Sequence, residues 1–238
     1  ACVVSLISEI RGFYMNLSKL LLGTSLSLAT FIGLSANAIA TNNTNFTKTY
    51  VAQQPNCKNP QTQTELNICS GVDYQRADQK INQVYNQVRD QLSANRRQQL
   101  IVAQRAWISF RDANCKFARS TVEGGTMAPL IANNCLEDLT KKRTLELNSY
   151  AQNQMPQSNG KNFQTVDRKL NQVYQNTIDN LSVSRQSQLK IAQRAWIVFR
   201  DANSKFESSL SNGDKQLSLI RMTEQRTQAL VDFSQQSR

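Results

Sequence analysis

The sequence predicts an all-α protein made of two tandem three-helix antiparallel units, the first of them disulfide-stapled. One observation is a fifteen-residue phrase that occurs twice, as AQRAWISFRDANCKF at 103–117 and AQRAWIVFRDANSKF at 192–206. A second is the recurrence of apolar residues every three or four positions, which is the period of a helix. A third is the scarcity of turn residues, because four prolines and eight glycines in 238 residues are too few for a β-sandwich.

The repeat extends beyond the phrase. A shift of 89 positions aligns residues 74–117 with 163–206 without a gap, and 26 of these 44 positions are identical. The copies then diverge, the second is six residues shorter at the next turn, and the register recovers at Arg143 and Arg226. Such a repeat indicates one supersecondary unit used twice. We place the first unit at 57–150, a linker at 151–162 and the second unit at 163–238.

The residues before the first unit differ in character. Met15, a short segment with Lys19, an apolar run over 20–34 and the small-residue sequence SANAIA have the layout of a secretory signal peptide at 15–40. The apolar run is shorter than the roughly 20 residues of a membrane span, which disfavours an uncleaved anchor. We interpret residues 1–14 as an upstream or misassigned start, and the polar residues 41–56 as a disordered segment.

Each unit is expected to contain three helices. In the first unit, a capping box at Thr62 begins the first helix, and Ser70-Gly71 is expected to interrupt it before its main stretch at 73–92. A break at 93–95 precedes the second helix, which ends at Gly124-Gly125. Pro129 lies near the start of the third helix, where the N–H that proline lacks is not needed.

A hairpin folded at about Ala94 brings together residues of the first two helices whose numbers sum to about 189. Asp78 then faces Arg111, Asn82 faces Trp107 and Tyr85 faces Gln104. The second unit repeats these pairs as Asp167 with Arg200, Asn171 with Trp196 and Tyr174 with Gln193. We interpret the Asp–Arg pairs as structural bridges rather than catalytic or anion-binding pairs.

The aromatic residues on the helical stripes are interpreted as core. Trp107 and Trp196 could serve as ligand-stacking platforms, but each lies on the apolar stripe of its helix, together with Phe110 and Phe199. Burial of such a ring contributes about 2–3 kcal/mol. The indole N–H needs a partner, and Asn82 and Asn171 are the expected ones.

Four cysteines remain after the predicted signal peptide, an even number that indicates two disulfides in an exported chain. If the second and third helices fold at about Gly124, Cys115 lies next to Cys135. A Cys57–Cys69 bond would then tie the entry segment to the first helix, and Cys69–Cys115 is the alternative. The second unit has serine at 204 in place of Cys115 and no partner cysteine, so serine there avoids a stray thiol.

The sequence lacks the residues that several functional classes require. The chain has no histidine, which excludes Ser-His-Asp and Cys-His nucleophiles and histidine metal sites. No CxxC pair, P-loop or GxGxxG sequence is present. We therefore expect that the protein is not an enzyme and that it binds no cofactor, metal or small-molecule substrate. Nucleic acid is not an expected partner either, because the aromatic residues lie on the core stripes and the chain is predicted to be exported.

The motifs of the first unit resemble a known family. TQTELNIC at 62–69, ADQKINQVY at 77–85, AQRAWISFRDANC at 103–115, GGTMAP at 124–129 and CLEDLTKKR at 135–143 are similar to the lysozyme inhibitor LprI-like N-terminal domain, found in small exported or lipid-anchored bacterial proteins. The second unit keeps the central motif but lacks the cysteines and the GGTMAP turn. The resemblance implies a periplasmic or secreted protein whose partner is lysozyme or another wall hydrolase.

The charge suggests a second hypothesis. The formal net charge is +11, and it becomes +10 when Arg11, Lys19 and Glu9 leave with residues 1–40. Lysozymes are themselves strongly cationic, and like charges weaken binding unless local patches compensate. A basic structural or adhesive protein that binds anionic wall polymers or acidic envelope proteins is therefore the alternative. The candidate binding residues are the turn residues Gly124, Gly125, Thr126 and Met127 and the basic residues Arg96, Arg97, Lys141 and Lys142.

Overall fold

The computed structural model describes residues 55–155 and 162–236, and within them the chain forms six α-helices, one 3-10 turn and no strand. The predicted upstream start and signal peptide lie outside the described residues, as do all but the last two residues of the predicted polar segment. The elements are α2 (Gln63–Gln91), α3 (Ala94–Arg119), η1 (Ser120–Val122), α4 (Ala128–Ala151), α5 (Phe163–Asp179), α6 (Val183–Glu207) and α7 (Lys215–Gln236). The all-α prediction is confirmed.

The first helix is continuous, so the predicted interruption at Ser70-Gly71 is wrong. The capping box is present: the Thr62 hydroxyl accepts a hydrogen bond from the Glu65 N–H, and the Glu65 carboxylate accepts one from the Thr62 N–H. Ser70 is buried, and its hydroxyl donates to the Asn67 carbonyl 2.9 Å away, inside the helix. A serine that satisfies its hydroxyl within its own helix has no need to break it.

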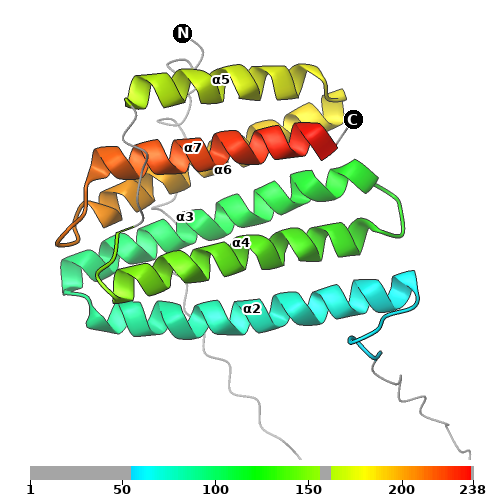
Figure 1. Cartoon of the computed structure of the whole chain (residues 1–238), viewed down its shortest axis with the longest axis horizontal. Helices are drawn as coiled ribbons and strands as arrows, with labels where there is room; N and C mark the ends of the chain where they lie inside the picture. The colour runs from blue at the N-terminus through cyan, green and yellow to red at the C-terminus, as the bar shows by residue number, and fades with distance from the viewer. Residues whose placement is uncertain (1–54, 156–161, 237–238) are drawn as a thin grey trace, which may run out of the picture. The chain divides into compact units, whose positions relative to one another are not determined.

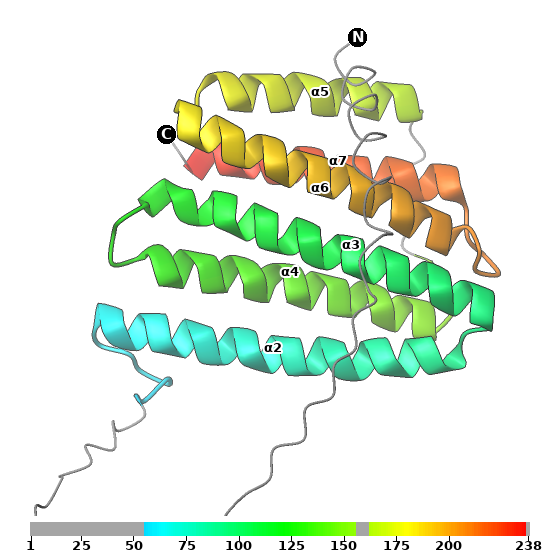
Figure 2. The same ribbon diagram turned by 180° about the vertical axis from the view of Figure 1, so that it is seen from behind.

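The two units meet through their middle helices. α3 and α6 run antiparallel side by side at the centre, with α4 and α2 on one side and α7 and α5 on the other (Figures 1 and 2). Within the first unit α2 packs mainly against α4, and within the second α5 packs mainly against α7. The duplicated phrase lies on α3 and α6, so it builds the contact between the units as well as the core of each.

Two glycines shape the turns. Gly124, between η1 and α4, has φ +78°, a conformation that residues with a Cβ rarely adopt. Gly213, between α6 and α7, lies so close to the Glu207 carbonyl that a Cβ there would be 1.7 Å from its oxygen. Pro129 occupies the first turn of α4, as predicted.

Candidate functional site

Both predicted disulfides are present, at the end of the first unit where α2 begins and α3 ends. Cys57 is bonded to Cys69 and Cys115 to Cys135, with Cα–Cα distances of 5.3 and 5.4 Å. The alternative Cys69–Cys115 pairing is therefore wrong. One bond fixes the segment before α2 and the other joins α3 to α4, so this end of the first unit is held covalently.

Hydrogen bonds hold the turn between η1 and α4 to the start of α2. The Asn67 amide donates to the Thr126 carbonyl at 2.9 Å. The Asn133 amide, from α4, donates to the Asn67 carbonyl at 3.3 Å and to the Ser70 hydroxyl at 3.0 Å. Met127 stays 44% exposed on this anchored turn. A shallow pocket beside it is lined by Gln63, Thr64, Asn67, Arg119, Gly124, Gly125, Thr126, Ala128 and Pro129.

The charge at this end is mixed. The backbone N–H groups of Gln61 and Thr62 donate to the Glu65 carboxylate and lower the pKa of Glu65, which keeps it ionised. Glu123 stands next to Gly124 on the turn, and Lys58, Lys116 and Arg119 supply positive charge nearby, the last two in the final turn of α3. The strong overall positive charge is therefore not concentrated at this end of the first unit.

The predicted binding residues do not form one site. Arg96 and Arg97 lie in the first turn of α3, whereas Gly124, Gly125, Thr126 and Met127 follow its far end, more than 20 residues or about 30 Å along the helix. Arg97 donates to the carbonyls of Arg89 and Leu92 and so caps the end of α2. Lys141 pairs with Glu137 at 2.6 Å, which raises the pKa of Lys141.

The predicted Asp–Arg bridges are present in both units. Asp78 lies 3.6 Å from Arg111, and Asp167 lies 3.8 Å from Arg200. Each guanidinium also pairs with the next residue in the chain, Asp112 or Asp201, at 2.8 Å. Each also lies over the indole of its own unit, 5.0 Å from the Trp107 centroid and 5.1 Å from the Trp196 centroid.

The tryptophans are core residues, since Trp107 and Trp196 are each 3% exposed. Tyr85 and Tyr174 pack at the edge of the same core, and partial burial raises the pKa of Tyr174. The expected indole partners do not play that role: the amides of Asn82 and Asn171 are exposed and donate to Asp78 and Asp167 in the preceding turn. Amide and carboxylate four residues apart on one helix face meet more easily than groups on two helices.

The contact between the units is built from reciprocal interactions. The Phe110 and Phe199 rings stack with centroids 5.9 Å apart and an interplanar angle of 8°. Arg143 of α4 donates to Gln104 of its own unit at 3.2 Å and to Asn203 of the other unit at 2.8 Å. Arg226 of α7 repeats this pattern, donating to Gln193 at 2.9 Å and to Asn114 at 2.7 Å. Each guanidinium lies over the stacked phenylalanine of the other unit.

A second polar cluster, centred on Glu207 of the second unit, has no equivalent in the first unit. The buried Glu207 carboxylate accepts hydrogen bonds from the Tyr150 hydroxyl, from the Asn203 amide at 2.8 Å and from Arg221 at 2.6 Å. Glu146 continues the network, 3.3 Å from Arg221 and 2.9 Å from Arg143. Burial, followed by the charge of Glu207, raises the pKa of Tyr150 well above its ordinary value, so this phenol stays protonated.

Sequence reasoning missed these polar contacts between the units. Gln104 and Asn114 recur as Gln193 and Asn203 in the phrase, and the repeat register returns at Arg143 and Arg226. Polar residues repeated on a helical stripe that should be apolar are the signal that could have found them. The sequence does not show, however, that a buried arginine will bond the other unit.

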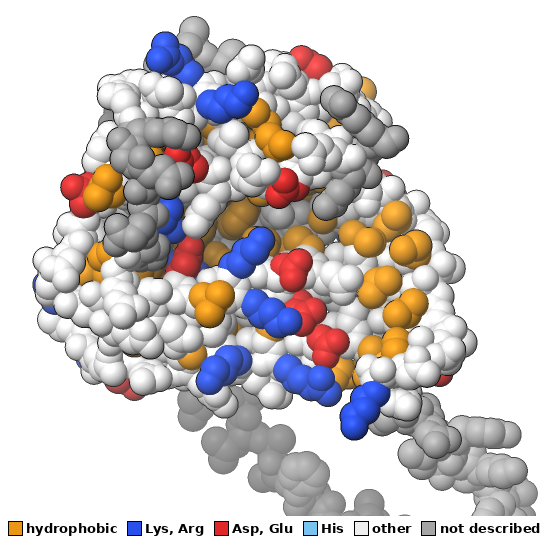
Figure 3. Space-filling view, in the orientation of Figure 1, with side chains coloured by type: hydrophobic (Ala, Val, Ile, Leu, Met, Phe, Trp, Pro, Cys, Tyr) orange, Lys and Arg blue, Asp and Glu red, His pale blue; other side chains and the backbone are white. Residues whose placement is uncertain are grey.

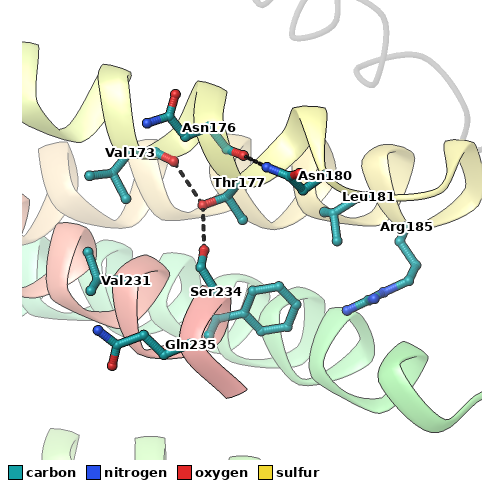
Figure 4. Close-up of a pocket in the computed structure, with 10 residues that line it drawn as sticks. Val173, Asn176, Thr177, Asn180, Leu181, Arg185, Val231, Ser234 and Gln235 are labelled. Atoms are coloured by element: carbon teal, nitrogen blue, oxygen red, sulfur yellow. Dashed lines mark hydrogen bonds between the residues drawn. The ribbon is translucent and has the colours of Figure 1, made fainter. Parts of the chain in front are cut away.

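Two further cavities are of comparable size. One, of about 490 Å³, lies between the end of α5, the start of α6 and the end of α7, with Thr177, Asn176, Asn180 and Arg185 on its wall (Figure 4). The Thr177 and Ser234 hydroxyls lie 3.0 Å apart there. The other, of about 480 Å³, lies between α4 and α7 with α3 and α6 beneath.

Residues 55–155 and 162–236 contain no cluster of three or more His, Cys, Asp or Glu side chains suited to a metal ion. None of their helices combines the length and apolar character needed to cross a membrane.

Comparison with known proteins gives a consistent assignment. A family model described as "Lysozyme inhibitor LprI" matches residues 56–147 and again residues 148–230. An uncharacterised protein of Rhizobium meliloti (strain 1021) is 36% identical over 107 residues, covering 40% of this chain and 77% of that protein. The crystal structure of an uncharacterised protein from Burkholderia thailandensis shares the fold, with a TM-score of 0.57, 18% identity, and coverage of 73% of this chain and 89% of that one.

Proposed function

The chain belongs to the lysozyme inhibitor LprI family, and from that premise we propose that it is an exported, non-catalytic envelope protein that binds and inhibits a wall-degrading muramidase. The binding element in this proposal is the stapled turn, defined as residues 124–127 with the segment of α2 to which they are bonded. This element supports the proposal because it is held by two disulfides and by the Asn67–Thr126 hydrogen bond. A loop fixed in advance loses little conformational freedom on binding, which favours tight binding.

Its surface chemistry is also suitable. Met127 offers an exposed apolar side chain at the tip of the turn. Glu65 and Glu123 offset two of the three nearby cations, Lys58, Lys116 and Arg119, so a cationic enzyme would meet less repulsion here than the net charge of +11 suggests. The second unit has a different turn, shorter and without cysteines, and in this proposal it does not contact the enzyme.

A turbidity assay on cell-wall suspensions with several purified lysozymes tests the proposal. We expect the wild-type protein to slow clearing at micromolar concentration, and the Met127→Asp variant to lose at least tenfold in potency. Leu217→Asp is the matched control, because Leu217 is 45% exposed at the equivalent end of the second unit and Met127 is 44% exposed. No slowing by the wild type, or equal loss in both variants, would contradict the proposal.

A second candidate function is adhesion to anionic wall polymers, favoured by the formal net charge of +11. Phosphate- and carboxylate-bearing polymers attract such a protein through many exposed contacts that salt weakens. A pull-down on purified wall material at rising salt distinguishes the two. Retention that is lost only at high salt and is unchanged by Met127→Asp supports adhesion, whereas no retention at low salt excludes it.

A further inference from the structure

The groove between the two units is built equally by both of them. It runs between α4 and α7, and Trp107, Phe110, Trp196 and Phe199 of α3 and α6 lie beneath it. Figure 3 shows a hollow on this face, with hydrophobic side chains in its floor and charged side chains along its edges. Its volume of about 480 Å³ is within the range of small-molecule sites.

Two buried arginines line this groove, and they differ in their partners. Arg143 is neutralised by the Glu146 carboxylate 2.9 Å away. Arg226 donates only to the neutral side-chain oxygens of Gln193 and Asn114, and within the described residues it forms no ion pair. The residue that corresponds to Glu146 in the second unit is Ala229, so the repeat lacks a carboxylate where the first unit has one.

Arg226 is thus a cation with little compensation. It is 4% exposed, and its Nη2 atom, like that of Arg143, is buried without a hydrogen-bond partner in the described part of the chain, so the missing carboxylate is what distinguishes Arg226. Burial lowers the pKa of Arg226 to about 10, which is the effect expected when no carboxylate stabilises the charge. Two hydrogen bonds and the Phe110 ring offset part of the desolvation cost of this charge, and a ligand carboxylate beside it would offset more.

The remaining groups that line the groove indicate the charge of a ligand. Lys142, Arg143 and Arg226 are positive, and Glu146 and Asp232 are negative, which leaves one positive charge. Glu146 is engaged by Arg143 and Arg221, and Asp232 is exposed and accepts a hydrogen bond from Gln228 at 2.7 Å. A ligand with a single negative charge balances the groove, whereas a doubly charged phosphate would leave it with a net negative charge.

We propose that the groove binds a small amphiphilic carboxylate, whose carboxylate pairs with Arg226 and whose apolar body lies between Leu139 and Leu145 of α4 and Ala229 of α7. Leu145 is 67% exposed at the groove edge, an apolar side chain that such a ligand would cover. This site is separate from the stapled turn and does not depend on the proposed muramidase contact.

The probe for the test is 4-cyclohexylbutanoate, with the corresponding amide as a neutral control of the same shape. The chain contains two tryptophans, and both line the groove, so tryptophan emission reports binding directly. We expect a saturable change in emission with the carboxylate, matched by calorimetry, and at least tenfold weaker binding of the amide. Equal affinity for the amide, or no saturation at millimolar carboxylate, would overturn the proposal.

Variants locate the site. Arg226→Gln should weaken carboxylate binding at least tenfold, whereas Arg185→Gln, at the other cavity, should leave it unchanged. Because Arg226 is buried, its substitution can also impair folding, so Ala229→Phe provides a second variant at an exposed position that fills the groove. It should abolish binding, while Gln98→Phe, exposed on α3 outside the groove, should not. Carboxylate binding that survives Ala229→Phe would place the ligand elsewhere and contradict the proposal.

Discussion

At one equivalent pair of positions, the two units join their second and third helices by different interactions. In the first unit Cys115 and Cys135 join α3 to α4 covalently. The corresponding residues of the second unit are Ser204 and Ser218, and their hydroxyls lie 3.1 Å apart in a buried hydrogen bond between α6 and α7. The second unit therefore keeps the contact but not the bond. Serine at 204 has a partner after all, which the sequence comparison did not reveal.

A second difference offsets the first. The first unit has Ala118 and Asp138 where the second has Glu207 and Arg221, the charged pair that bonds to Tyr150 of the first unit. The covalent unit is thus stabilised from within, whereas the other is also stabilised by a polar network that crosses the contact between the units. The first unit therefore has a covalent link that the second lacks, and the polar network joins the two units.

The largest expected effect comes from breaking the crossing network. Glu207→Ala leaves Arg221 buried without its closest carboxylate, and removal of one member of a buried pair costs about 3–5 kcal/mol. Urea unfolding followed by circular dichroism measures the loss. Lys205→Ala, at an exposed position on the same helix that forms no ion pair within the described residues, should change stability by less than about 0.5 kcal/mol. Equal losses would mean that the network does not stabilise the contact.

The next effect concerns the covalent unit. Replacing Cys115 and Cys135 together by serine gives the first unit the residues of the second. The bond closes a segment with a sequence separation of 20, for which the chain-entropy estimate of stabilisation is about 3 kcal/mol. Urea unfolding of the double variant should show a loss of that size while the helical signal is retained. A loss below about 1 kcal/mol would show that the serine pair is an equivalent substitute.

The reverse exchange should stabilise the protein by a smaller amount. Ser204→Cys with Ser218→Cys gives the second unit the cysteines of the first, and we expect them to form a bond because their hydroxyls already lie in contact. Engineered bonds gain less than the entropy estimate, so about 1–3 kcal/mol is expected. Thiol titration before and after reduction measures formation of the bond. Two free thiols in the oxidised folded protein would show that the units differ in backbone geometry here.

The smallest expected effect concerns the Asp–Arg bridges, which are alike in the two units. Asp78→Asn and Asp167→Asn each remove a half-exposed bridge to an arginine that keeps a second carboxylate partner. Such pairs contribute about 0.2–1 kcal/mol, and both variants should lose the same amount within error in the urea experiment. A clear difference between them would show that the repeated bridge has different roles in the two units.

The parts of the fold that local chemistry controls could be predicted from the sequence. The capping box at Thr62, the Cys115–Cys135 bond and the Asp78–Arg111 bridge all follow from spacing along a helix or across one turn. The continuity of α2 through Ser70 could not, since packing against α4 and an internal hydrogen bond outweigh the weak helix propensity of Ser-Gly.

The contact between the units could not be predicted from the sequence, for a related reason. A repeat preserves any geometry, so it does not show which faces meet. Arg143 and Arg226 belong to polar stretches that are typical of exposed surface, but both are buried and each bonds to a residue of the other unit. The candidate binding residues were dispersed for the same reason: Arg97 and Met127 are each exposed, but they lie at opposite ends of the first unit.

We expect the two units to unfold as one cooperative body, because the duplicated phrase on α3 and α6 joins them. Each unit contains one tryptophan, so Trp107→Phe leaves a reporter in the second unit and Trp196→Phe leaves one in the first. In urea, tryptophan emission and far-ultraviolet circular dichroism of each variant should give the same midpoint, as an all-or-none transition requires. Emission from one unit changing at a lower urea concentration than the helical signal, with a plateau between, would contradict the account.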